Sequence, residues 1–146
     1  MKALTLHAPW AWAICFLGKR VENRTWAPPS GMIGKRFAIH AGSAKLWTLA
    51  ELIPVLNLWH TIHRGEQYDQ RFPPAEDFCS AIVATARLVG VEPPLPGPSR
   101  MIGWRVSDQF GWMLGDDIQV LETPVKCRGA LKLWTVPDEL ERRIMQ

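Results

Sequence analysis

The chain opens with an alternation of apolar and polar residues that then gives way to an apolar run. Residues 2–7 alternate, which predicts a strand. The run behind them begins at Pro9, a residue suited to the first turn of a helix because its missing N–H would have no partner there. We expect this helix to end at Leu17, with Gly18 as a left-handed cap. A second short strand is expected over residues 20–25.

The same periodicities predict the remaining elements of the chain. Strands are expected over residues 35–41, 78–91, 110–114, 118–121 and 127–135, helices over 43–53, 54–64 and 137–145, and loops over 27–31, 66–77 and 92–99. Pro54 is expected to break one helix or to start the next. Residues 115–117, with the sequence Gly-Asp-Asp, are typical of a hairpin turn. About six short strands with inserted helices indicate one α+β domain over residues 1–146, built on a small, mostly β barrel.

Charge is distributed unevenly along this chain of 146 residues. The first 45 residues carry seven of the seventeen basic side chains but only one carboxylate, that of Glu22, whereas the remainder carries more acid than base. A basic half favours an anionic partner, nucleic acid first, and a solvated basic surface is the simpler alternative. Tryptophan is also unusually frequent, with eight residues. We expect some of them to line a groove and others to fill the core.

Cysteines, histidines and long apolar runs indicate neither a cofactor nor a membrane segment. The three cysteines lie far apart and form no C-x-x-C pair, so we expect a reduced, cytoplasmic protein without a metal or another cofactor. His60 and His63 lie three residues apart but lack a third ligand. The apolar run over residues 8–18 is too short to span a bilayer, and its positive charges follow it, unlike those of a signal peptide. No membrane association is expected, and the oligomeric state is left open.

A charged motif after the first helix carries a resemblance to a known family. Lys19, Glu22 and Arg24 form the pattern Lys-x-x-Glu-x-Arg. It is preceded by Leu-His-x-Pro-Trp-Ala at residues 6–11 and followed by Ile-His-Ala at residues 39–41. Together these segments resemble the ASCH domain, which belongs to the PUA-like β-barrel superfamily. The resemblance implies a small PUA-like barrel of about six strands with flanking helices.

The resemblance covers residues 2–42 and about 103–136, and residues 43–77 are interpreted as a helical insertion. One position departs from the family pattern, which commonly has a glycine two residues before the motif lysine. Here Leu17 occupies that position and the glycine is Gly18. The turn into the motif is therefore expected to differ from that of the family.

The motif residues suit a polar ligand. Lys19 and Arg24 can hold a phosphate or a carbonyl oxygen, and Glu22 can accept a hydrogen bond from the exocyclic amine of a base. The simpler alternative is that Glu22 only neutralises Arg24. Trp10 and Trp26 bracket the motif and can stack on a base, although packing in the core is as plausible for Trp10.

Three further residues are candidates for ligand contacts. Pro9 at a helix start leaves neighbouring N–H groups free, which favours a phosphate nearby. His7 and His40 lie at the ends of predicted strands and could act as proton shuttles or hydrogen-bond donors. Both are equally well explained as structural histidines.

These features predict a basic cleft that binds RNA, a nucleoside or a nucleotide. The resemblance implies a hydrolase as the alternative, because one branch of small bacterial ASCH proteins hydrolyses the amide of cytidine acylated on its exocyclic amine. That branch uses a Lys, a Thr and a distant Glu; Lys19 matches the Lys, Glu22 stands at the Thr position, and Asp108 is the best candidate for the distant acid. Other members look like ribonucleases or plain RNA binders. A third possibility is an interaction module whose proline-rich loop over residues 92–99 docks a protein.

Overall fold

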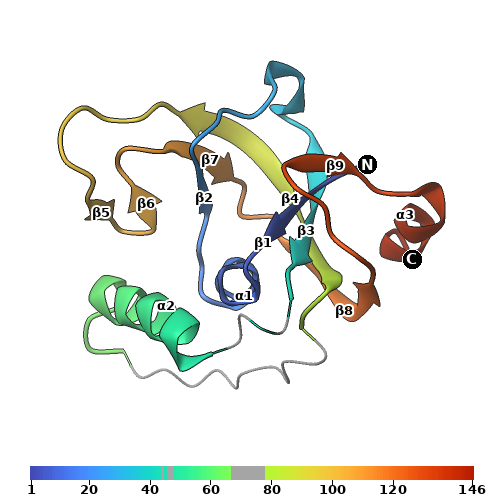
Figure 1. Cartoon of the computed structure of the whole chain (residues 1–146), viewed down its shortest axis with the longest axis horizontal. Helices are drawn as coiled ribbons and strands as arrows, with labels where there is room; N and C mark the ends of the chain where they lie inside the picture. The colour runs from blue at the N-terminus through green and yellow to red at the C-terminus, as the bar shows by residue number, and fades with distance from the viewer. Residues whose placement is uncertain (44, 46–47, 67–77) are drawn as a thin grey trace.

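The computed structural model describes residues 1–43, 45, 48–66 and 78–146, and these residues form an α+β fold (Figure 1). The helices are α1 (Ala8–Phe16), α2 (Leu49–Ile62) and α3 (Asp138–Ile144), with a short 3₁₀ turn over Ser30–Met32. The strands are β1 (Lys2–Leu6), β2 (Val21–Arg24), β3 (Arg36–Ala41), β4 (Ala81–Glu92), β5 (Met101–Ile102), β6 (Arg105–Val106), β7 (Phe110–Leu114), β8 (Gln119–Lys126) and β9 (Leu133–Thr135). The predicted α+β class is confirmed.

Strand β4 lies at the centre of the main sheet. Across the described residues the strand order is β2-β7-β4-β3-β1-β9, and β8 also pairs with β4. Strands β1 and β3 are parallel, and the other pairs are antiparallel. No pairing within this part of the chain joins the edge strands β2 and β9. In Figure 1, α1 connects the lower ends of β1 and β2, which places the charged motif of β2 near the end of β1.

The prediction of a hairpin at residues 115–117 is wrong, because β7 and β8 do not pair with each other. Strand β7 ends opposite Leu88 and β8 begins opposite Thr85, so the two strands follow each other along β4 instead of pairing together. The N–H of Gly115 donates to the carbonyl of Arg87 at 3.0 Å, which keeps the connection on the same partner. Strand β4 has twelve residues, and this length accommodates both strands in succession.

The predicted helix break at Pro54 is also wrong, because α2 passes through this residue. The helix starts later than predicted, where the hydroxyl of Thr48 accepts a hydrogen bond from the N–H of Glu51 at 3.4 Å. Val55 and Trp59 are buried. Their packing stabilises the helix on the far side of the proline and offsets the missing backbone hydrogen bond.

The segment that was predicted as one strand over residues 127–135 is mostly irregular, and only its end forms β9. Residues 127–132 leave the sheet and cross over His40. Gly129 approaches this histidine so closely that a Cβ atom would lie 2.5 Å from a ring carbon. The close approach leaves no room for a side chain at this position, which favours glycine.

A two-stranded hairpin, β5–β6, was not predicted. Each of its strands has two residues, which is too short for a periodic pattern to reveal. The hairpin turns at Gly103, where φ is +58°. The side chain of Asn23 accepts from the N–H of Val106 and donates to the carbonyl of Trp104, both at 2.8 Å. These two hydrogen bonds fix the hairpin beside β2.

The remaining boundaries agree more closely with the sequence patterns. The strands predicted over 20–25 and 110–114 correspond to β2 and β7, and the terminal helix corresponds to α3. The strand predicted over 78–91 starts later, at Ala81, and ends at Glu92. The helical insertion predicted over 43–77 lies partly outside the described residues, and so does most of the loop predicted over 66–77.

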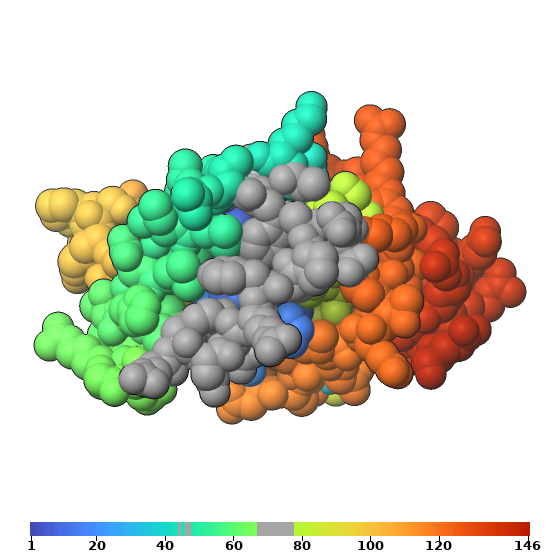
Figure 2. Space-filling view, turned by 90° about the horizontal axis from the view of Figure 1, so that it is seen from below, coloured from blue at the N-terminus to red at the C-terminus, as the bar shows by residue number. Residues whose placement is uncertain are grey.

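Helix α1 is buried on nearly all sides. Pro9 lies in its first turn, and Gly18 after its end has a φ of +73°, as the sequence predicted. Ile14 and Leu17 are buried, but Trp10 is only partly buried. The helix packs between β3 and α2, while α2 and α3 lie at opposite ends of the molecule (Figure 2). Trp10 near the start of the helix and Phe16 at its end are thus the large side chains through which this otherwise buried helix reaches the surface.

Candidate functional site

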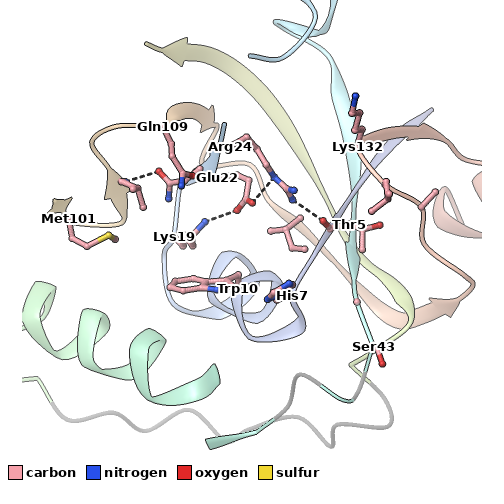
Figure 3. Close-up of a pocket in the computed structure, with 16 residues that line it drawn as sticks. Thr5, His7, Trp10, Lys19, Glu22, Arg24, Ser43, Met101, Gln109 and Lys132 are labelled. Carbon is pink, nitrogen blue, oxygen red and sulfur yellow. Dashed lines mark hydrogen bonds and ion pairs between the residues drawn. The ribbon is translucent and has the colours of Figure 1, made fainter. Parts of the chain in front are cut away.

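A cavity of about 590 Å³ lies beside α1 and β2. Its walls come from the ends of β1, β2 and β3, the start of α1, the β5–β6 hairpin with the turn after it, and the segment before β9. The lining residues are Thr5, Leu6, His7, Trp10, Lys19, Glu22, Asn23, Arg24, Gly42, Ser43, Met101, Val106, Gln109, Ala130, Leu131 and Lys132. The predicted motif residues Lys19, Glu22 and Arg24 are therefore brought together in one cavity (Figure 3).

These three side chains form a row, here called the charged row, with Glu22 in the middle (Figure 3). The ammonium of Lys19 donates to Oε2 of Glu22 at 2.9 Å, and Nε of Arg24 lies 3.1 Å from Oε1. Lys19 is 2% exposed and Glu22 is 8% exposed. The positive partner beside each carboxylate oxygen offsets part of the cost of burying this charge. The ion pair between Glu22 and Arg24, which the sequence offered as the simpler alternative to a ligand site, is present, and Lys19 joins it.

The backbone around Gly18 explains how the charged row forms. Gly18 turns the chain out of α1 in a left-handed conformation, and the N–H of Lys19 bonds back to the carbonyl of Ala13 at 3.2 Å. Strand β2 then places Glu22 and Arg24 on one face, because alternate residues of a strand share a face. Arg20, in contrast, donates to the carbonyl of Ile14 at 2.9 Å and closes the end of α1.

The charged row has unused hydrogen-bonding capacity. An ammonium has three donors, and that of Lys19 uses one on the carbonyl of Val21 and one on Glu22. Arg24 has five donors; its Nη2 donates to the carbonyl of Thr5 at 2.8 Å, and its Nε, 3.1 Å from Oε1 of Glu22, is buried and makes no hydrogen bond of good geometry to the described residues. A carboxylate has about four acceptor positions, of which the two cations occupy two. The row can therefore bind a further polar group directly.

Trp10 forms the aromatic wall of the cavity. Its ring centre lies 5.7 Å from the ammonium of Lys19 and 6.4 Å from the ring of Trp104, which meets it edge-on. His7 also lines the cavity, and its Nδ1 lies 3.6 Å from a carboxylate oxygen of Glu51 on α2. Two of the predicted ligand-binding side chains, those of Trp10 and His7, thus accompany the charged row.

Four other predicted site residues do not line the cavity. Trp26 packs edge-on against Trp112, with ring centres 4.8 Å apart. Pro9 is buried in the first turn of α1. Asp108 is exposed and accepts a hydrogen bond from the hydroxyl of Ser99 at 2.7 Å. The fourth, His40, is described separately below. The chain turns after β2 and after β6, and these turns direct Trp26 and Asp108 elsewhere.

His40 is buried behind the cavity wall, under the segment that follows β8. Its Nε2 lies 3.1 Å from the carbonyl of Cys127, and its Nδ1 has no hydrogen-bond partner in the part of the chain that is described. Burial lowers the pKa of His40 below its ordinary value, and the contact with Cys127 opposes this only partly. His40 is therefore neutral at neutral pH, and it contacts the ring of Trp134 edge-on. This placement fits a structural histidine.

Several cavity residues were not predicted. Met101 comes from strand β5, Gln109 comes from the turn after β6, and Leu131 and Lys132 come from the segment before β9. Leu131 is 93% exposed at the rim. Lys132 adopts a φ of +57°, a conformation uncommon outside glycine. These residues reach the cavity only because segments about 80 to 110 positions away fold beside β2, and no local pattern encodes that.

The described residues contain no cluster of three His, Cys, Asp or Glu side chains able to hold a metal ion. Burial raises the pKa of the Cys15 thiol to about 12, so this thiol stays protonated and unreactive at neutral pH. Among the helices of the described residues, none is long and apolar enough to cross a membrane. The sequence matches no known family model and no curated protein.

Proposed function

We propose that the chain is an ASCH-type member of the PUA-like superfamily and that its cavity binds a nucleoside. The nucleoside is either free or an unstacked base of single-stranded RNA. The observation that carries the proposal is the meeting of Lys19, Glu22 and Arg24 with the face of Trp10 in one cavity. A flat heterocycle with a polar edge fits this combination, because it stacks on the aromatic ring and bonds to the charged row.

The size and the charge of the cavity support this proposal. A volume of about 590 Å³ is in the range of sites for small organic ligands. Its lining contains three basic side chains, those of Lys19, Arg24 and Lys132, and one carboxylate. The excess of positive charge favours a ligand that carries a phosphate, with the phosphate near the open rim. A base can then lie deeper, beside the charged row.

Binding fits the geometry better than hydrolysis. Lys19 and Glu22 share the cavity, but Glu22 stands where the hydrolases of the resembled branch have a threonine, and Asp108 lies outside the cavity, bonded to Ser99. Two donors of the Lys19 ammonium are committed to Val21 and Glu22. This leaves a lysine that is held in place and can donate a hydrogen bond, and it leaves no third catalytic group beside it.

The docking-module alternative is less well supported. The proline-rich loop before β5 is held against the hairpin, because Arg105 donates to the carbonyl of Pro93 at 2.9 Å and Leu95 donates to the carbonyl of Ser107 at 2.7 Å. A loop whose backbone is already bonded within its own chain offers fewer free groups to a partner. The cavity remains the better candidate for a binding site.

The proposal is tested by titrating the protein with the four nucleoside monophosphates and with short single-stranded RNA at 50 and 200 mM salt. We expect binding that weakens as salt rises and that weakens further in Arg24→Gln. Arg142→Gln on α3 is the matched control, because this arginine is exposed and α3 contributes no residue to the cavity lining. Absence of binding to every nucleotide and RNA would refute the proposal. Incubation with an acylated cytidine and with RNA, beside Lys19→Ala, tests hydrolysis; product formation that requires Lys19 would favour the hydrolase.

A further inference from the structure

The order of groups along the charged row specifies the kind of edge that it can bind. Lys19 offers a donor, Glu22 offers an acceptor and Arg24 offers a donor, in that sequence (Figure 3). All three have capacity left after their contacts within the chain, as described above. The complementary ligand edge therefore presents an acceptor, a donor and a second acceptor.

We infer that the charged row selects a cyclic imide edge, C(=O)–NH–C(=O), such as that of uracil or thymine. This inference rests on the proposed function of the cavity as a nucleoside site. The imide N–H would donate to Glu22, while the two flanking carbonyl oxygens would accept from Lys19 and Arg24. Because Lys19 and Glu22 are almost completely buried, a ligand that covers either one without offering a complementary group to its remaining donor or acceptor loses affinity.

The other bases satisfy the row less completely. Cytosine presents a donor followed by two acceptors, so it can satisfy Glu22 and one cation but not both cations around Glu22. On its Watson–Crick edge, adenine offers one donor beside one acceptor. Guanine offers one acceptor and two donors, and its second donor would face a cation. Among the Watson–Crick edges of the four RNA bases, the imide of uracil is the one that satisfies all three positions.

A simple anion is also a poor fit to the middle of the row. Phosphate and carboxylate oxygens accept hydrogen bonds, but Glu22 at the centre is itself an acceptor and carries negative charge. An anion at this position would be repelled by Glu22, although Lys19 and Arg24 would attract it. The row is thus better suited to a neutral heterocycle than to a free phosphate, and a phosphate of the same ligand belongs at the rim near Lys132.

The experiment compares ligands that differ at the imide. Uridine 5′-monophosphate, its N3-methyl derivative and cytidine 5′-monophosphate are titrated into the unmodified protein by calorimetry. Methylation of N3 removes the donor and leaves the carbonyls and the ring in place. We expect the affinity for the uridine nucleotide to exceed that for each of the other two by about tenfold or more, the effect of one hydrogen bond to a charged group. Oligo(U) and oligo(C) of equal length form a second arm, which distinguishes a free nucleotide from a base in RNA as the source of the imide.

The outcomes separate this inference from the proposed function. Equal affinity for the three nucleotides, or a preference for cytidine, would overturn the imide assignment and leave nucleoside binding intact. Binding of none of them, and of neither oligonucleotide, would overturn both. Glu22→Gln provides a check on the protein side: an amide cannot accept hydrogen bonds along both of its edges, so the uridine preference should fall. The N3-methyl comparison needs no variant, so it holds even if Glu22→Gln does not fold.

Discussion

The protein contains two clusters of the same charge composition in very different settings. In the charged row, Glu22 lies between Lys19 and Arg24. In a second set, here called the outer cluster, Asp117 forms ion pairs with Arg36 and with Arg87, the latter at 3.4 Å. The side chain of Asp117 is 49% exposed, whereas that of Glu22 is 10% exposed. Two arginines and an aspartate at the surface form ion pairs that hold two segments together. Two cations and a glutamate inside a cavity form a candidate binding site.

The two clusters differ in their access to solvent and in how many of their hydrogen-bonding groups lack a partner. Water can replace any lost contact in the outer cluster, and salt screens its charges, so these ion pairs contribute little. The charged row is shielded by α1 and β2, so each of its polar groups depends on a specific partner. The outer cluster also holds the connection between β7 and β8 against β4, and this is the place where a hairpin was wrongly predicted.

The largest expected effect is on stability. Glu22→Ala leaves two cations without their carboxylate, one of them almost fully buried, and should lower the free energy of unfolding by about 3 kcal/mol. Asp117→Ala should lower it by no more than about 1 kcal/mol. Urea unfolding followed by tryptophan fluorescence measures both. Equal losses for the two variants would show that the charged row is as well solvated as the outer cluster.

The next effect concerns the aromatic wall, which the outer cluster lacks. Trp10→Leu should weaken binding of uridine 5′-monophosphate by about 1–3 kcal/mol, the usual contribution of stacking on one base. Trp26→Leu is the matched control, because Trp26 was an equal candidate in the sequence but packs on Trp112 outside the cavity. Calorimetric titration of both folded variants gives the comparison. A loss of affinity in Trp26→Leu as large as in Trp10→Leu would contradict the proposed position of the base.

A smaller effect on nucleotide affinity is expected when one arginine of each cluster is replaced by glutamine. Arg24→Gln removes a charged donor beside Glu22 and should reduce the affinity for the same nucleotide about tenfold, which is about 1.4 kcal/mol. Arg87→Gln should leave it unchanged, because Arg87 lies in the outer cluster. The two variants lose the same charge, so a general effect of net charge would lower both affinities equally. That result would show that the cavity does not use Arg24 specifically.

The smallest effect concerns the pH dependence of stability that arises from His40. It tests how well this histidine is shielded from water behind the cavity wall. Its pKa is lowered in the folded protein, so the unfolded chain binds more protons as the pH falls. The stability from keeping His40 neutral is present above about pH 6.5 and is lost as the pH falls below that value. The free energy of unfolding should therefore decrease between pH 7.5 and 5.5, and His40→Gln should flatten this dependence. Parallel pH profiles for the two proteins would show that His40 is not responsible.

Local patterns were most successful where the contacts are local. The shared face of Glu22 and Arg24 could be predicted from the alternation along β2, whereas the position of Lys19 beside them depends on the turn at Gly18 and came only from the structure. The left-handed cap at Gly18 could also be predicted, because it depends only on residues that are close in sequence. The outer cluster, in contrast, joins residues that lie 30 and 81 positions apart, and no periodic pattern indicated it. The errors at Pro54 and in the connection between β7 and β8 have the same origin. In both places, tertiary packing outweighed the local preference, which was for a helix break at Pro54 and for a hairpin turn at residues 115–117.

The sequence by itself determined the α+β class, the alternation of β2 and the identity of the charged groups, because backbone preferences and side-chain chemistry act over a few residues. Only the tertiary structure decided which tryptophan lines the cavity, that Asp108 lies outside it, and that Lys132 and Gln109 lie within it. These outcomes depend on the pairing of distant strands around β4 and on the approach of Gly129 to His40. A cavity is a property of surfaces brought together from several segments, so its chemistry can be present in the sequence while its shape is not.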